Sequence, residues 1–138
     1  MKFSIITTWL ASAAVLQAAD SNNPPAASAQ IEHGKYLVER VGMCGDCHSP
    51  RNDKGEFDRA QWLQGSILAF QPLVKMPWSA DAPAIAGLPG YTDEKAMTLL
   101  TTGRLPSGEA LRPPMPAYRL NESEAKAVVA YLRSLAKS

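Results

Sequence analysis

Residues 43–50 read MCGDCHSP, and this stretch contains both cysteines of the 138-residue chain. Cys44 and Cys47 are three positions apart, and His48 directly follows the second cysteine. Two cysteines placed at random would give this spacing with a following histidine roughly once in several thousand sequences, so the pattern is informative. Three chemistries use such a pair: a redox dithiol, half of a zinc site, or the anchor of a covalently bound haem.

The dithiol and zinc interpretations fit the rest of the sequence poorly. A thioredoxin-like pair lies at the end of a strand in a βαβ unit, where a helix N-terminus stabilises the thiolate. Here the pair follows a helical pattern, and no strand is predicted. A structural zinc site needs about four Cys or His ligands. Beyond the three motif residues the chain offers only His33, which would have to fold back from the preceding helix.

The haem interpretation uses all three motif residues. Cys44 and Cys47 are one helical turn apart and share one helix face, so both sulfurs can form thioethers with the two vinyl groups on one edge of a porphyrin. His48, one position further on, is then placed beneath the iron as an axial ligand. Gly45 and Asp46 only need to leave room for the ring. A bound haem would also explain how a small domain rich in loops is stable.

The second axial ligand is predicted to be Met115. It lies in LRPPMPAYRL, where Pro113, Pro114 and Pro116 restrict the backbone on both sides of the methionine. We therefore expect a stiff, extended segment that presents one thioether. A thioether binds iron weakly, so such a ligand has to be held in position by the chain. Met76, in KMPW, is the alternative ligand. An isolated methionine is more often part of a core than a metal ligand.

The N-terminal region has the features of an export signal. Lys2 precedes an apolar stretch from Ile5 to Leu16, and two small residues follow at 18 and 19. We therefore predict a signal peptide over residues 1–19, which leaves no membrane span after cleavage. Residues 20–30, DSNNPPAASAQ, lack apolar periodicity and are predicted to be a disordered leader. Residues 31–138 then form a single domain.

The charge of the chain is balanced. There are 14 Lys and Arg residues against 13 Asp and Glu residues, and removal of the signal peptide takes away Lys2 alone. A neutral protein is a poor candidate for binding nucleic acid or an anionic membrane surface. One cysteine pair also closes too small a loop to stabilise an exported domain as a disulfide.

The predicted architecture is all-α, with about three to five helices and long loops around one covalently bound haem. Helical patterns cover residues 31–43, 93–102 and 121–135, with a short helical piece near 58–63. Thr92 suits the N-cap of the second helix, Gly103 suits its end, and Asn121 with Glu124 resembles a capping box. Residues 49–91 are rich in proline and glycine and are predicted to be mostly loop.

CGDCH near the start of the domain, Met-Pro in its second half and the terminal EAKAVVAYLRSL together resemble a class I cytochrome c. The resemblance covers residues 31 to about 135. Within the family, the chain is most similar to small monohaem cytochromes of the bacterial periplasm, including those that serve dehydrogenases. It implies one haem c attached through Cys44 and Cys47, with His48 and Met115 as iron ligands. It also implies that the first and last helices cross, with Gly34 and Tyr36 near Tyr131.

His/Met ligation would fill both axial positions of the iron and favour electron transfer over catalysis. The sequence therefore predicts a periplasmic electron carrier whose partners are redox proteins such as a dehydrogenase, an oxidase or another cytochrome. The alternative is a cytochrome subunit of a dehydrogenase or oxidase complex. A haem enzyme or gas-binding protein is a third hypothesis. Candidates to contact the haem propionates are Trp62, Trp78, Arg51 and Arg112.

Overall fold

The computed structural model describes residues 25–137. The predicted signal peptide over 1–19 and the first part of the predicted leader, 20–24, lie outside this range. The described chain contains four α-helices, α1 (Pro25–Tyr36), α2 (Gly45–His48), α3 (Asp93–Thr102) and α4 (Glu122–Ser134), and a two-stranded antiparallel sheet of β1 (Ser66–Ile67) and β2 (Asp81–Ala82). A π-helical turn (Leu37–Val41) extends α1, and a 3-10 turn covers Arg59–Gln61.

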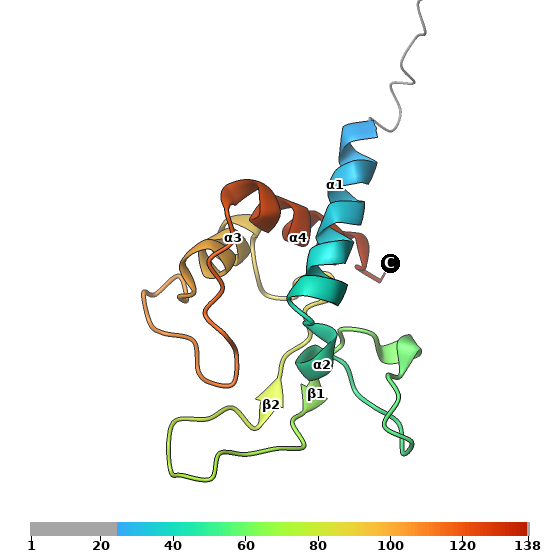
Figure 1. Cartoon of the computed structure of the whole chain (residues 1–138). Coiled ribbons are helices and arrows are strands. Elements are labelled where there is room, and N and C mark those ends of the chain that lie inside the picture. Colours follow the sequence, from blue (N-terminus) through green and yellow to red (C-terminus); the bar gives the residue numbers. More distant parts are fainter. Residues whose placement is uncertain (1–24, 138) are drawn as a thin grey trace, which may run out of the picture.

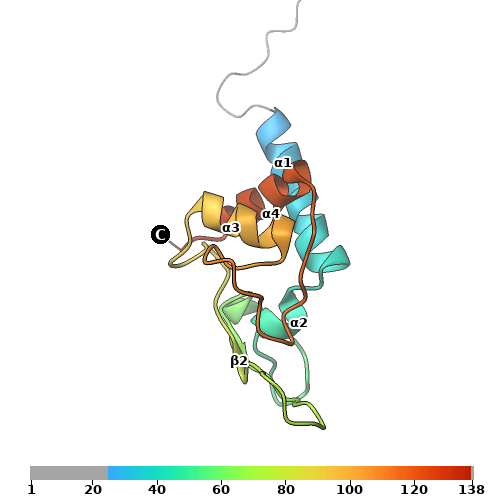
Figure 2. The same ribbon diagram turned by 90° about the vertical axis from the view of Figure 1, so that its left-hand side faces the viewer.

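The three long helices, α1, α3 and α4, form the upper part of the molecule, and the short helix α2 lies beneath α1 next to the small sheet (Figure 1). The view turned by 90° shows α3 and α4 against α1, with the segment between α3 and α4 descending to the level of α2 (Figure 2). This helical arrangement confirms the predicted fold class. The expectation that no strand would form was wrong in a minor way, because Ser66 pairs with Ala82 and Ile67 with Asp81.

The first helix begins earlier than predicted. Residues Pro25–Gln30, assigned from composition to a disordered leader, form the start of α1. Proline is well suited to the first helical position because its missing N–H would have no partner there, and alanine has the highest helix propensity. The stretch PAASAQ therefore has a local reason to be helical despite its polar flanks.

The α1–α4 crossing is the main contact of the fold. It is close because Gly34 has no side chain: a Cβ at this position would overlap the carbonyl oxygen of Ala127 and lie 2.9 Å from the Cβ of Tyr131. The Tyr131 hydroxyl donates a hydrogen bond of 2.6 Å to Glu39 in the π-helical turn. This confirms the predicted crossing and the place of Gly34 in it. Tyr36, in contrast, is 57% exposed and is not part of the packed crossing.

The buried core joins the π-helical turn, α3 and α4 to two loop residues. Its apolar members are Leu37, Val38, Leu63, Leu88, Ala96, Ala125, Ala127, Val128, Val129, Tyr131 and Leu132. The predicted caps are present: Thr92 Oγ1 accepts from Lys95 N–H, Gly103 adopts the left-handed conformation at φ 68°, and Asn121 and Glu124 form a reciprocal capping box. These local features explain why α3 and α4 start and end where the sequence predicts.

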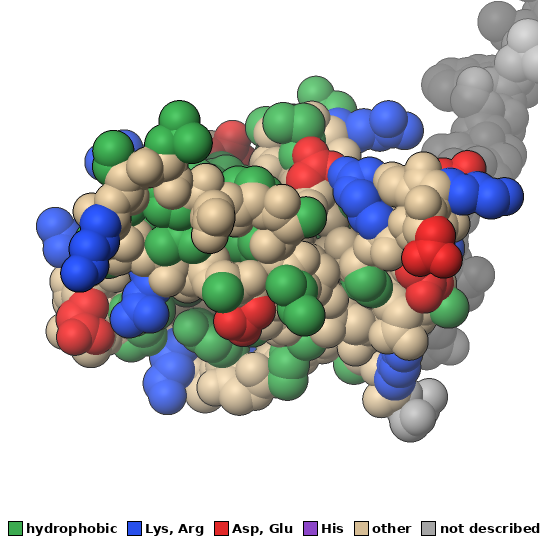
Figure 3. Space-filling view, turned by 90° about the horizontal axis from the view of Figure 1, so that it is seen from below, with side chains coloured by type: hydrophobic (Ala, Val, Ile, Leu, Met, Phe, Trp, Pro, Cys, Tyr) green, Lys and Arg blue, Asp and Glu red, His purple; other side chains and the backbone are tan. Residues whose placement is uncertain are grey.

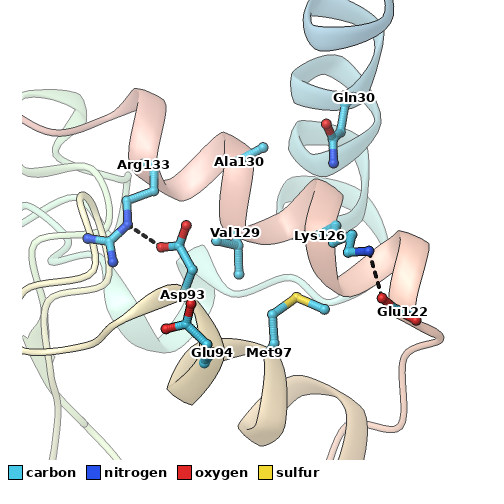
Figure 4. Close-up of a pocket in the computed structure, with 9 residues that line it drawn as sticks. All are labelled: Gln30, Asp93, Glu94, Met97, Glu122, Lys126, Val129, Ala130 and Arg133. Carbon is cyan, nitrogen blue, oxygen red and sulfur yellow. Dashed lines mark hydrogen bonds and ion pairs between the residues drawn. The ribbon is translucent and has the colours of Figure 1, made fainter.

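Arg133 fastens the end of α4 to the start of α3. Its guanidinium donates to a carboxylate oxygen of Asp93 at 2.8 Å and to the carbonyl oxygens of Gly87 and Tyr91, each at 2.6 Å. The Asp93–Arg133 pair lines an open groove of about 660 Å³ between α1, α3 and α4, with Met97 and Val129 beside it (Figure 4). None of the predicted site residues lines this groove.

Candidate functional site

The predicted haem-attachment motif, residues 44–48, is built around a short helix and is called the attachment motif below. Cys44 precedes α2, and Cys47 and His48 lie within it, so the three motif residues are held on one turn of backbone. Gly45 is required here because a side chain at this position would overlap the indole ring of Trp62. Trp62 in turn packs edge-on against Phe57, with ring centroids 5.4 Å apart. The motif therefore rests on an aromatic layer.

His48 is buried, and its ring is oriented by a backbone carbonyl. Its Nδ1 lies 2.7 Å from the carbonyl oxygen of Pro83. A carbonyl oxygen only accepts, so Nδ1 carries the hydrogen and Nε2 keeps its lone pair. Burial lowers the pKa of His48, which favours this neutral form. A ring nitrogen held in this way is typical of metal-ligating histidines. Sequence reasoning could not identify Pro83, because any residue supplies a carbonyl.

Neither of the two cysteines has the environment of a reactive dithiol. Burial raises the pKa of Cys44, and burial followed by the nearby charge of Asp46 raises that of Cys47. Redox-active pairs have the opposite shift, towards the thiolate. Within residues 25–137 no three His, Cys, Asp or Glu side chains are grouped as a metal site would require, and His33 lies exposed on α1. Both results disfavour the thiol and zinc interpretations.

Met115 lies in the segment between α3 and α4. The segment is not fully extended as predicted: the Pro113–Pro114 peptide bond is cis, and the backbone N–H of Met115 donates to the carbonyl oxygen of Arg112 at 3.3 Å. Met115 is half-buried, whereas Met76 is 42% exposed in the β1–β2 loop. The same segment is bonded to the chain just before the motif, because the Tyr118 hydroxyl donates to the carbonyl oxygen of Gly42 at 2.7 Å.

The surroundings of the motif fit a haem. The indole N–H of Trp78 is buried and has no hydrogen-bond partner in the described part of the chain, so it is a donor that a haem carboxylate would satisfy. Large apolar side chains are exposed on the segments around the motif: Val41, Met43, Ile67 and Phe70. Figure 3 shows the face that carries α2 and the β1–β2 loop, where hydrophobic side chains are spread widely and Lys and Arg lie towards the edges.

The other propionate candidates are engaged elsewhere or remain exposed. Arg51 pairs with Asp46 at 3.1 Å and lies over the ring of Phe57. Trp62 packs beneath Gly45, and its indole N–H is also buried without a hydrogen-bond partner in the described residues. Arg112 is exposed, and its side chain has no ion pair within residues 25–137. Trp62 and Trp78 therefore share a buried indole N–H without a hydrogen-bond partner in the described residues, and Trp78 is the one that does not lie beneath Gly45.

Three relatives are informative. A diheme cytochrome c-type protein of Cereibacter sphaeroides is 39% identical over 71 residues, covering 46% of this chain and 24% of that protein. The fructose dehydrogenase cytochrome subunit of Gluconobacter japonicus is 29% identical over 107 residues, covering 74% of this chain and 21% of that protein. A nicotinate dehydrogenase subunit of Pseudomonas putida is 31% identical over 129 residues, covering 87% of this chain and 10% of that protein. This chain thus spans a quarter or less of each relative.

The family match extends over almost the whole described structure. The model of the cytochrome c family matches residues 31–136, from the middle of α1 to the residues that follow α4. The matched range includes the attachment motif, the buried histidine and the Met115 segment. The family match and the geometry of the motif lead to one conclusion: the chain belongs to the cytochrome c family.

Proposed function

We propose that this chain is a one-electron carrier with a single haem c, attached through Cys44 and Cys47 and ligated by His48 and Met115. Cytochrome c family membership supports electron transfer and a covalently bound haem c. The observation that carries the proposed ligand set is His48 itself: a buried, neutral imidazole whose Nδ1 is bonded to Pro83 and whose Nε2 is free to bind a metal. The bound haem supplies the redox chemistry.

The residues of this chain hold that group and limit what it can do. Cys44 and Cys47 would attach it, Trp78 offers a buried donor for a carboxylate, and His48 and Met115 would be its iron ligands. If both side chains bind the iron, no position is left for oxygen or peroxide. The haem would then supply one-electron transfer, and these two side chains would need to rearrange little.

Optical spectra of the purified protein test the ligand set. Low-spin spectra in both oxidation states that carbon monoxide leaves unchanged would support six-coordinate iron. Met115→Ala should then become sensitive to carbon monoxide, whereas Met76→Ala should behave as the wild type. A wild-type protein that binds carbon monoxide would rule out Met115 as the ligand and favour a gas-binding protein or haem enzyme. Carbon monoxide sensitivity in Met76→Ala alone would transfer the role to Met76.

A second function, as a subunit of a dehydrogenase complex, is favoured by the β1–β2 loop. Its tip exposes Leu73 completely (104%) and Val74 at 69%, and exposed apolar patches commonly mark interaction sites. Two of the relatives are named as dehydrogenase subunits. Residues 101–120 also carry three arginines, Arg104, Arg112 and Arg119, against one acidic residue, Glu109, and this excess of positive charge would suit an acidic partner surface.

The size of the native particle distinguishes the two functions. The tagged chain, expressed in its native host, would run as a monomer if it is a free shuttle. If it is a subunit, it would run in a larger particle, and Leu73→Asp would release it from that particle. Lys54→Asp, at another exposed loop, is the control and should leave the particle intact.

Export through residues 1–19 to the periplasm is part of the proposal, and the presence of mature protein in a periplasmic extract would test it. No helix within residues 25–137 has the length and apolar character of a membrane span.

A further inference from the structure

The segment that carries Met115 is tied to the rest of the fold at several points. The backbone N–H of Ser79 donates to the carbonyl oxygen of Pro113 at 2.8 Å, and that of Leu120 donates to Leu100 at 3.0 Å. Ala117 packs on Gly103, where an added Cβ would lie 2.6 Å from the Ala117 methyl carbon. These contacts join the segment to the β1–β2 loop and to α3. None of them reaches the attachment motif.

Tyr118 supplies that missing connection. Its hydroxyl donates to the carbonyl oxygen of Gly42 at 2.7 Å, joining residues 76 positions apart in the chain. Gly42 lies two residues before Cys44, and Tyr118 lies three residues after Met115. The bond therefore connects the segment of the proposed distal ligand directly to the segment that begins the attachment motif.

The hydroxyl also lies beside the attachment sulfur. A Cβ built on Gly42 would be 3.2 Å from Cys44 Sγ, from Tyr118 Oη and from the carbonyl oxygen of Leu37, so these groups converge on the bare glycine. Burial raises the pKa of Tyr118 above the ordinary value of a tyrosine. Tyr118 thus remains a protonated donor at neutral pH, and its hydrogen bond persists over the range in which such a protein works.

We propose that Tyr118 is a positioning residue for the distal ligand: its bond to Gly42 holds the Met115 segment against the attachment motif. This inference rests on the proposed role of Met115. A thioether is a weak ligand, so its occupancy of the iron depends on how closely the chain confines it near the metal. Loss of the Tyr118 bond would leave the Gly42 carbonyl without its partner and release the segment on the side facing the cysteines.

An imidazole titration of the oxidised, haem-loaded protein measures this confinement, because imidazole has to displace Met115 to bind. Tyr118→Phe keeps the aromatic ring and removes only the hydroxyl. One lost hydrogen bond of ordinary strength corresponds to about a tenfold change in an equilibrium constant. We expect imidazole to bind Tyr118→Phe about tenfold more tightly than the wild type.

Tyr131→Phe is the matched control. It removes the same atom and a hydrogen bond of similar length, to Glu39, but at the α1–α4 crossing. A purely structural effect would lower the resistance of both variants to urea and leave imidazole affinity unchanged in both. Positioning by Tyr118 predicts tighter imidazole binding in Tyr118→Phe alone.

A second variant approaches the same contact from the other side. Gly42→Ala would place a methyl group 3.2 Å from the Tyr118 hydroxyl, from Cys44 Sγ and from the Leu37 carbonyl oxygen, so the hydroxyl would have to shift by a few tenths of an ångström. We expect tighter imidazole binding here as well. If both variants bind imidazole within about twofold of the wild type, the positioning role is wrong. If wild type and Met115→Ala bind imidazole equally, Met115 is not the ligand, and the proposed ligand set fails first.

Discussion

Replacement of Gly34 by alanine tests whether the α1–α4 crossing determines the stability of the fold. An alanine Cβ would overlap the carbonyl oxygen of Ala127, lie 2.5 Å from its carbonyl carbon and lie 2.9 Å from the Cβ of Tyr131. Ordinary contacts of a Cβ begin at 3.4 Å, so the two helices would have to separate by roughly 1 Å. The obstacle is helix backbone, which cannot rotate away as a side chain can.

The expected cost follows from two opposing effects. Overpacking a well-packed site costs about 1–3 kcal/mol, and a backbone obstacle places this substitution at the upper end. Alanine gains about 1 kcal/mol over glycine in helix propensity. The free energy of unfolding should therefore fall by about 2 kcal/mol, which would lower the urea midpoint of the haem-loaded protein by roughly 1 M.

Urea titrations followed by helical circular dichroism would measure the effect. Glu32→Ala, an exposed position on the same helix, is the control for helix propensity, and it should leave the midpoint nearly unchanged. If Gly34→Ala were as stable as the wild type or more stable, propensity alone would govern the site. The inference that α1 and α4 are in backbone contact at Gly34 would then be refuted.

Two further predictions concern contacts of α4. Arg133→Lys should lower the free energy of unfolding by about 2 kcal/mol, because a single ammonium replaces the planar guanidinium that bonds Asp93 (Figure 4) and the carbonyl oxygens of Gly87 and Tyr91. Arg119→Lys, at an exposed position, is the control, and equal urea midpoints would contradict the prediction. Stability should also fall as the pH rises from 10 towards 12. Burial, followed by the bond to Glu39, raises the pKa of Tyr131 from 10.0 to about 12. In this interval the folded state therefore keeps a proton that the unfolded state loses, so rising pH favours the unfolded state. Tyr131→Phe should lose less stability than the wild type over the same interval, and parallel losses would show that Tyr131 does not contribute.

The sequence predicted those parts of the fold whose causes are local. The bounds of α3 follow from a threonine cap at one end and a glycine at the other, and α4 follows from its capping box. The attachment motif is also local, because its spacing fixes which residues share a helix face. These elements were identified without any knowledge of their neighbours.

Contacts between distant backbone atoms could not be predicted in this way. The acceptor for His48 is the carbonyl of Pro83, 35 residues later, and the acceptor for Tyr118 is the carbonyl of Gly42. Every residue carries a carbonyl oxygen, so no residue type marks the one that is used. The early start of α1 was missed for a different reason: its Pro-Ala stretch was interpreted by composition instead of by position in a helix.

The long segment between α2 and α3 shows how a helix of one turn can be held rigidly. The segment forms hydrogen bonds with the carbonyl end of α2. Gly65 N–H donates to the carbonyl oxygen of His48 at 2.8 Å, and Ser66 Oγ donates to that of Cys47 at 2.6 Å. These are orphan carbonyls at the end of a helix too short to satisfy them internally.

The same loop also forms hydrogen bonds with the side chains of Ser49 and His48. Ser49 Oγ accepts from the Leu63 N–H at 2.8 Å, and the Pro83 carbonyl accepts from His48. The loop therefore satisfies the backbone of α2 and orients the imidazole that α2 carries. A four-residue helix has little surface with which to fix itself by packing, so the direction of His48 Nε2 depends on the loop that follows it. Substitutions in this loop should change the orientation of the His48 imidazole before they change the helical core.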